Sequence, residues 1–136
     1  MALSTLTLAP QSSSAATLRA WLRTVLAEEG IPKRASEEIV QAAEEALNAA
    51  ILHGASGEEI TITLSTVGLD IYLTVSDSGT GLHDERLADK QTDIGDDTTD
   101  LGLLLVRGLM DEVTLRSTAE GTVIRLVKHL RRPVSA

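Results

Sequence analysis

The sequence predicts an α/β fold of two layers, in which one mostly antiparallel sheet is covered on one face by three helices. Two observations predict this fold. Some segments alternate apolar with polar residues, whereas others repeat apolar residues at helical spacing. These segments follow one another in the order strand, helix, helix, strand, strand, loop, helix, strand, strand. At 136 residues the chain has the size of one domain, and we expect a single domain over residues 1–136.

The first half of the chain contains one expected strand and two expected helices. The strand covers residues 3–8 and is rich in Leu and Thr. The first helix runs from about Ala15 to Glu29, where leucines recur at helical spacing. The second runs from about Ala35 to His53, and we expect Ser36 to cap its start. Each helix has one apolar face that must pack against the sheet.

The second half contains two expected hairpins separated by a long polar stretch and a helix. Residues 60–64 and 69–75 alternate cleanly, and Gly68 lies between them. The expected elements that follow are a loop over residues 76–100, a helix over residues 101–110, and strands over residues 113–115 and 122–127. A loop of that length inside a compact domain is usually functional.

Composition excludes several classes of protein. The formal charge is −8, and one Trp, one Tyr and no Phe are present, so we expect no nucleic-acid partner. No cysteine is available for a disulfide or a thiolate metal site. No apolar stretch approaches the length of a membrane span, and no signal peptide is visible. We therefore expect a cytoplasmic protein that does not associate with membranes.

A short motif at the end of the expected strand 69–75 can bind a flat ligand. It reads Asp77-Ser78-Gly79-Thr80-Gly81. A carboxylate at a strand end can accept a hydrogen bond from an exocyclic amine, and glycines let the backbone approach a ligand closely. Taken alone, the same residues are also compatible with a simple turn of small residues.

A second candidate segment begins the expected helix 101–110. Gly102 follows the long polar loop and lies at the helix N-terminus. Unpaired backbone N–H groups and the helix dipole make such a position suitable for an anion. The alternative interpretation is an amphipathic helix with a glycine near its start.

Together, three segments resemble the conserved boxes of the gyrase and histidine kinase ATPase superfamily, whose fold is called the Bergerat fold. They are residues 44–54 (EEALNAAILHG), residues 77–81 and residues 102–113 (GLLLVRGLMDEV). The small size and the Leu-Met-Asp-Glu-Val ending are similar to the bacterial anti-sigma-factor serine kinases. The resemblance covers about residues 3–127.

The resemblance implies a role for each matching residue. Asp77 would accept from the adenine amine of ATP, and Gly79 and Gly81 would shape the adenine pocket. Gly102 and Leu103 would bind phosphate through their N–H groups, and residues 83–99 would form a lid over the nucleotide. A glutamate of the second helix would act as general base or would orient the attacking hydroxyl, and an asparagine four residues later would help to hold Mg²⁺.

Two registers of the second helix fit the family pattern. Without gaps, Glu45 takes the position of the glutamate, and Ala49 takes the position of the asparagine. The alternative pair is Glu44 with Asn48, which retains both functional groups. One residue of shift is a rotation of about 100° on a helix, so the two stripes cannot both face the nucleotide. The ungapped register matches better at both ends, and it lacks the amide that would hold Mg²⁺.

A further departure is Asp100, which lies where the family usually has a glycine before the phosphate box. A carboxylate beside phosphates is unfavourable unless it points away. The resemblance implies a homodimeric anti-sigma factor that binds a sigma factor and uses ATP and Mg²⁺ to phosphorylate a small antagonist protein on serine or threonine. The alternative is a binding module of the same fold that phosphorylates nothing, which the departures at Ala49 and Asp100 favour.

Overall fold

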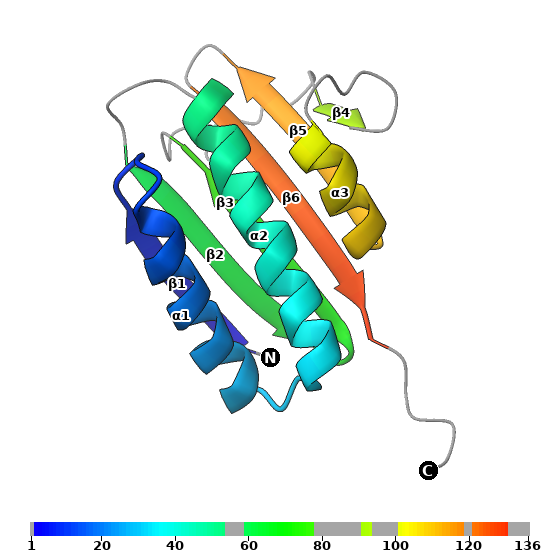
Figure 1. Ribbon diagram of the computed structural model, residues 1–136. Coiled ribbons are helices and arrows are strands. Elements are labelled where there is room, and N and C mark those ends of the chain that lie inside the picture. Colours follow the sequence, from blue (N-terminus) through cyan, green and yellow to red (C-terminus); the bar gives the residue numbers. More distant parts are fainter. Residues whose placement is uncertain (1, 54–58, 78–90, 94–100, 119–120, 131–136) are drawn as a thin grey trace.

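The computed structural model describes residues 2–53, 59–77, 91–93, 101–118 and 121–130 (Figure 1). Its elements are β1 (Ala2–Leu8), α1 (Ser14–Glu28), α2 (Lys33–His53), β2 (Ile60–Val67), β3 (Asp70–Ser76), β4 (Gln91–Asp93), α3 (Leu101–Leu109), β5 (Glu112–Thr118) and β6 (Gly121–His129). The strands form one antiparallel sheet in the order β1-β2-β3-β6-β5-β4. All three helices cover the same face (Figure 1), which confirms the predicted fold class.

The core lies between the sheet and the three helices. Alternate residues of the central strands, such as Ile62 in β2 and Leu73 in β3, point toward the helices and are fully buried. The alternation that predicted these strands therefore reflects burial on one face. The central helix α2 packs between α1 and α3, and Ala43 and Leu47 on its inner face have no exposed area. These contacts fix the rotation of α2 about its axis.

The start of α2 differs from the sequence prediction. The helix begins at Lys33, directly after Pro32, and the backbone N–H of Ser36 donates to the carbonyl oxygen of Pro32 at 2.8 Å. Ser36 is thus buried inside the first turn, and the prediction that it caps the helix is wrong. The fixed φ of proline suits a helix start, which explains why the helix begins there.

The polar stretch 76–100 contains a strand that the sequence analysis did not predict. β4 pairs with β5 at the sheet edge, with Gln91 opposite Arg116 and Asp93 opposite Thr114. Three polar residues are too few to show an alternating pattern, so this edge strand could not be recognised from the sequence. Residues 78–90 and 94–100 of the same stretch lie outside the described residues.

The face of the sheet away from the helices is polar. Thr74 and Arg125 lie opposite each other on β3 and β6, and the Arg125 guanidinium lies 5.2 Å from the centre of the Tyr72 ring. A cavity of about 590 Å³ opens on this face. Its lining includes Tyr72, Thr74, Arg116 and Arg125. In the described part of the chain no helix covers this surface (Figure 1).

Candidate functional site

The described parts of the three segments singled out in the sequence reach one end of the molecule. The C-terminal turns of α2, the end of β3 and the first turn of α3 all lie there (Figure 1). The antiparallel connection of β2 and β3 returns the chain to this end, and α3 packs directly against α2. The fold therefore brings together residues that are up to about sixty positions apart in the chain.

Asp77 is the buried carboxylate of this end. It follows directly after β3, and only 2% of its surface is exposed. Val75, two residues earlier, points toward the helices, so the period of a strand directs Asp77 toward the same side. Asp77 takes part in a polar interaction within the protein.

The first turn of α3 supplies backbone donors. Gly102 and Leu103 are the second and third residues of this helix, so their N–H groups are among those without an intrahelical acceptor. Such groups attract anions, and the helix dipole adds to the attraction. Gly79, Gly81 and Asp100 lie outside the described residues, so the expectations for them remain predictions.

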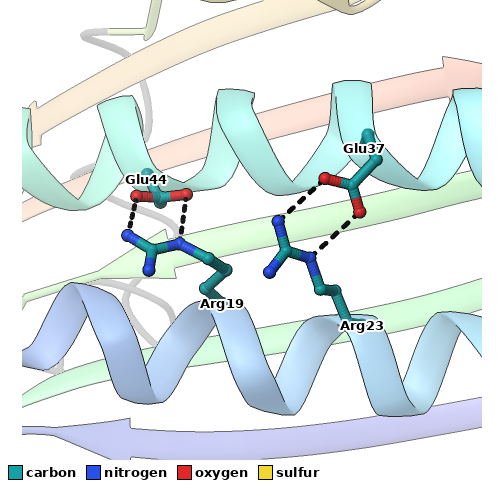
Figure 2. A network of polar contacts seen from close by, with 4 residues as sticks. All are labelled: Arg19, Arg23, Glu37 and Glu44. Atoms are coloured by element: carbon teal, nitrogen blue, oxygen red, sulfur yellow. Dashed lines mark hydrogen bonds and ion pairs between the residues drawn. The ribbon is translucent and has the colours of Figure 1, made fainter.

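One flank of α2 faces α1 through two ion pairs (Figure 2). Arg19 donates from Nε to Glu44 Oε2 at 3.1 Å and from Nη2 to Glu44 Oε1 at 2.8 Å. Arg23 makes the same two-bond contact with Glu37, at 3.0 and 2.8 Å. The hydrogen bond that Arg19 donates to Glu44 raises the pKa of Arg19, and the one that Arg23 donates to Glu37 lowers the pKa of Glu37. The carboxylate of Glu44 is thus engaged by α1.

The other flank of α2 faces α3 and β6. Lys128 of β6 lies 2.8 Å from Glu38 Oε1, and its ammonium also donates to the backbone carbonyl of Leu109 at the end of α3 at 2.7 Å. Glu45 lies seven residues after Glu38, which places both on one stripe of the helix. Glu45 is half-buried and makes no ion pair within the described part of the chain. Of the two α2 glutamates on this flank, Glu38 is therefore paired and Glu45 has no ion-pair partner among the described residues.

The two residues proposed for the metal position have different surroundings. Asn48 is exposed, whereas Ala49 is 3% exposed and belongs to the hydrophobic core. Glu44 and Ala49 are five positions apart, which corresponds to an angle of roughly 140° around the helix. The stripe of Glu45 and Ala49 thus borders α3, while Glu44 points toward α1.

Mg²⁺ was expected at this end of the molecule, and the described side chains fit it poorly. Among the residues that the structure describes, no group of three or more acidic, histidine or cysteine side chains is placed to hold a metal ion. The Glu44 carboxylate is paired, and Ala49 carries no oxygen in its side chain.

Arg19 and Lys128 form ion pairs with carboxylates of α2, and sequence reasoning did not identify either contact. Arg19 and Arg23 are four residues apart on α1, so they share one face of that helix. Glu37 and Glu44 share one face of α2 in the same way. Two arginines on one face of α1 and two glutamates on one face of α2 were the signal that could have indicated the pairing.

A buried carboxylate at a strand end and a helix N-terminus at the same end of a two-layer sandwich are compatible with a nucleotide-binding site. The chain belongs to the family of histidine kinase-like ATPase domains, whose pattern it matches over residues 8–128. This membership agrees with the resemblance to anti-sigma-factor kinases noted from the sequence.

Among solved structures, the chain is similar to the RsbU and RsbW domains of Rv1364c from Mycobacterium tuberculosis. The TM-score is 0.73 at 25% sequence identity, and the match covers 98% of this chain. It covers 34% of that chain, so the present chain spans about a third of the structure it matches. No curated protein sequence matched the chain. In the part of the chain that is described, no helix has the length and hydropathy to cross a membrane.

Proposed function

We propose that the chain is an anti-sigma factor and an ATP-dependent serine/threonine protein kinase. It binds a sigma factor and phosphorylates a small antagonist protein in a cytoplasmic partner-switching system, as a homodimer. The family of histidine kinase-like ATPase domains and the similarity to the RsbU and RsbW domains of Rv1364c support a role of this type.

The burial of Asp77 is the observation that carries the proposal. A carboxylate that is 2% exposed and lies at the end of β3 is suited to accept a hydrogen bond from the adenine amine. Gly79 and Gly81 of the same motif would let the backbone approach the adenine. The N–H groups of Gly102 and Leu103 in α3 would receive the phosphates.

The Glu45 carboxylate is the group we assign to the transfer step. It lies on the side of α2 that borders α3, and no cation of the described chain neutralises it. In the reaction the substrate hydroxyl oxygen bonds to the γ-phosphorus of ATP as the bond to the β-phosphate oxygen breaks. Glu45 accepts the hydroxyl proton, and ADP leaves with the electrons of the broken bond.

Calorimetric titration with ATP tests nucleotide binding. Asp77→Asn retains the size of the side chain and removes its charge, so we expect the affinity to fall roughly tenfold to a hundredfold. Asp70→Asn is the matched control, because Asp70 lies at the opposite end of the same strand. Circular dichroism shows whether both variants keep the fold. Equal affinities for Asp77→Asn and the wild type would contradict the proposed adenine contact.

A phosphoryl-transfer assay separates the kinase from the alternative function. The alternative is a module that sequesters a sigma factor or an antagonist without phosphorylating it, and the pairing of Glu44 and the alanine at position 49 favour it. With labelled ATP and a panel of small candidate antagonists, we expect label on the antagonist with the wild type and a large loss with Glu45→Gln. Glu44→Gln should retain transfer, because its carboxylate is held by Arg19. Binding of an antagonist without any label would favour the module.

A further inference from the structure

The rotation of α2 is determined by contacts on three sides. Its inner face is buried, with Ala43 and Leu47 fully covered. On one flank Glu44 is held by Arg19 of α1, and on the other Glu38 is held by Lys128 of β6. Turning α2 by about 100° to exchange the two registers would bury a charged carboxylate in the core, which is strongly unfavourable.

This rotation decides which α2 side chains can reach a nucleotide next to α3. Asn48 follows Glu44 by four residues and lies on the exposed side of the helix. Ala49 follows Glu45 by four residues and is buried beside α3. The side that borders α3 therefore carries the Glu45 carboxylate and the Ala49 methyl group, and Asn48 lies roughly 100° from Ala49 around the helix.

We propose that α2 supplies the nucleotide site with the Glu45 carboxylate and with no amide ligand for Mg²⁺. The nucleotide phosphates and water would then have to supply the ligands that an α2 amide does not, and Mg²⁺ commonly keeps several waters in such sites. The assignment rests on the proposed nucleotide binding, and it distinguishes this chain from a site that uses an α2 amide. It predicts that the Asn48 amide does not hold Mg²⁺, although Asn48 is only one residue from position 49, where the ungapped register places the asparagine of the family.

The experiment measures ATP affinity by calorimetry in Mg²⁺ and again in EDTA, using the whole chain. The ratio of the two affinities reports how much the metal contributes. We expect Asn48→Ala to leave this ratio within about twofold of the wild type, as for an ordinary surface substitution. Gln41→Ala is the matched control, because Gln41 is another exposed amide, seven residues earlier on the same stripe of α2.

A complementary variant introduces the missing ligand. Ala49→Asn should raise the Mg²⁺-to-EDTA ratio on the order of tenfold, the scale of effects seen when the surroundings of a metal are changed. Ala49 is buried, so Ala49→Ser, which is smaller and also adds an oxygen, is tested in parallel. Ala42→Ser is the control, because Ala42 is buried on the same flank seven residues earlier.

The outcomes separate this assignment from the proposed function. If the wild type binds ATP and Asn48→Ala lowers the affinity in Mg²⁺ but not in EDTA, the Asn48 amide does hold the metal and the assignment is wrong. If the wild type does not bind ATP in either condition, nucleotide binding itself is wrong. An unchanged ratio for Asn48→Ala supports the assignment even where the Ala49 variants do not fold.

Discussion

The two flanks of α2 carry the same type of side chain and differ in what surrounds it. On the flank toward α1, both glutamates are held by arginines in two-bond contacts (Figure 2). On the flank toward α3, Glu38 is held by Lys128 and Glu45 has no ion-pair partner in the described part of the chain. The first flank joins two helices, and the second borders the candidate site.

The ion-pair partners distinguish two carboxylates that their positions in the motif leave equivalent. Glu44 and Glu45 are adjacent in the sequence, yet only Glu44 meets an arginine. A carboxylate in a two-bond contact with arginine is held in one orientation, and the guanidinium offsets its charge. The unpaired carboxylate is therefore the better candidate for chemistry.

The largest expected effect concerns the core residue that positions both flanks. Leu47 has no exposed area and lies on the inner face of α2, so Leu47→Ala should lower the free energy of unfolding by about 2–5 kcal/mol. Urea denaturation followed by circular dichroism measures this change. Gln41→Ala, on the exposed side of the same helix, should change it by less than about 0.5 kcal/mol. Similar values for the two variants would contradict the rotation of α2 described above.

The next effect tests the tight packing on the α3 flank. Ala49→Leu inserts a large side chain where only 3% of the residue is exposed, and it should destabilise the fold by about 1–3 kcal/mol. Asn48→Leu is the adjacent control, and its exposed position should make the cost less than about 0.5 kcal/mol. Thermal denaturation of the two variants distinguishes the flanks directly. A larger loss of stability for Asn48→Leu than for Ala49→Leu would mean that position 48 is buried and position 49 is exposed, contrary to the rotation of α2 described here.

A smaller effect is expected from the ion pairs of the α1 flank. The side chains of Arg19 and Glu44 are 39% and 24% exposed, against 50% and 43% for Arg23 and Glu37. Because exposure weakens ion pairs, a double-mutant cycle with alanine should give a larger coupling for Arg19–Glu44 than for Arg23–Glu37. Both couplings should shrink when NaCl is added. A larger coupling for the more exposed pair would show that exposure does not rank these contacts.

Most of the fold could be predicted because burial is recorded in the spacing of apolar residues. The alternation in residues 60–64 and the helical stripes gave the correct elements and the correct layers. β4 was missed because three polar residues carry no pattern. The start of α2 was misplaced because Ser36 is a good capping residue. The helix begins earlier, at Lys33, directly after Pro32.

The candidate site was predictable to a lesser degree. Asp77 could be chosen from its motif, and its burial agrees with that choice. The register of α2 could not be chosen, because it depends on contacts between residues far apart in sequence. Arg19 and Glu44 are separated by 25 positions, and only the packing of α1 beside α2 brings them together. A one-residue ambiguity on a helix therefore needs the neighbouring helices to be known.

The smallest effect concerns an ion pair that responds to pH, unlike the arginine pairs of α2. His129 at the end of β6 lies with Nδ1 2.7 Å from Asp70 Oδ1 and Nε2 3.1 Å from Glu112 Oε2. Hydrogen bonding to Asp70, then to Glu112, raises the pKa of His129 above its ordinary value, and the charge of Asp111 adds to the shift. The stabilisation is therefore complete below about pH 6.5, the pKa of an unfolded histidine, and is lost as pH rises through the raised pKa.

The melting temperatures of the wild type and His129→Gln, measured at several pH values, test this pH dependence. The wild type should melt at the higher temperature at about pH 6, and the difference should narrow toward about pH 9. The histidine pKa itself can be followed by NMR titration. Asp70→Asn should lower the pKa of His129 more than Glu112→Gln does, because the Asp70 contact is the shorter one and the larger cause of the shift. A melting difference that grew with pH would mean that the neutral histidine is the form the fold stabilises. The His129 side chain is exposed, so solvent screens its contact with Asp70 and the contact contributes little to stability. The buried residues of α2 contribute more to the stability of the fold.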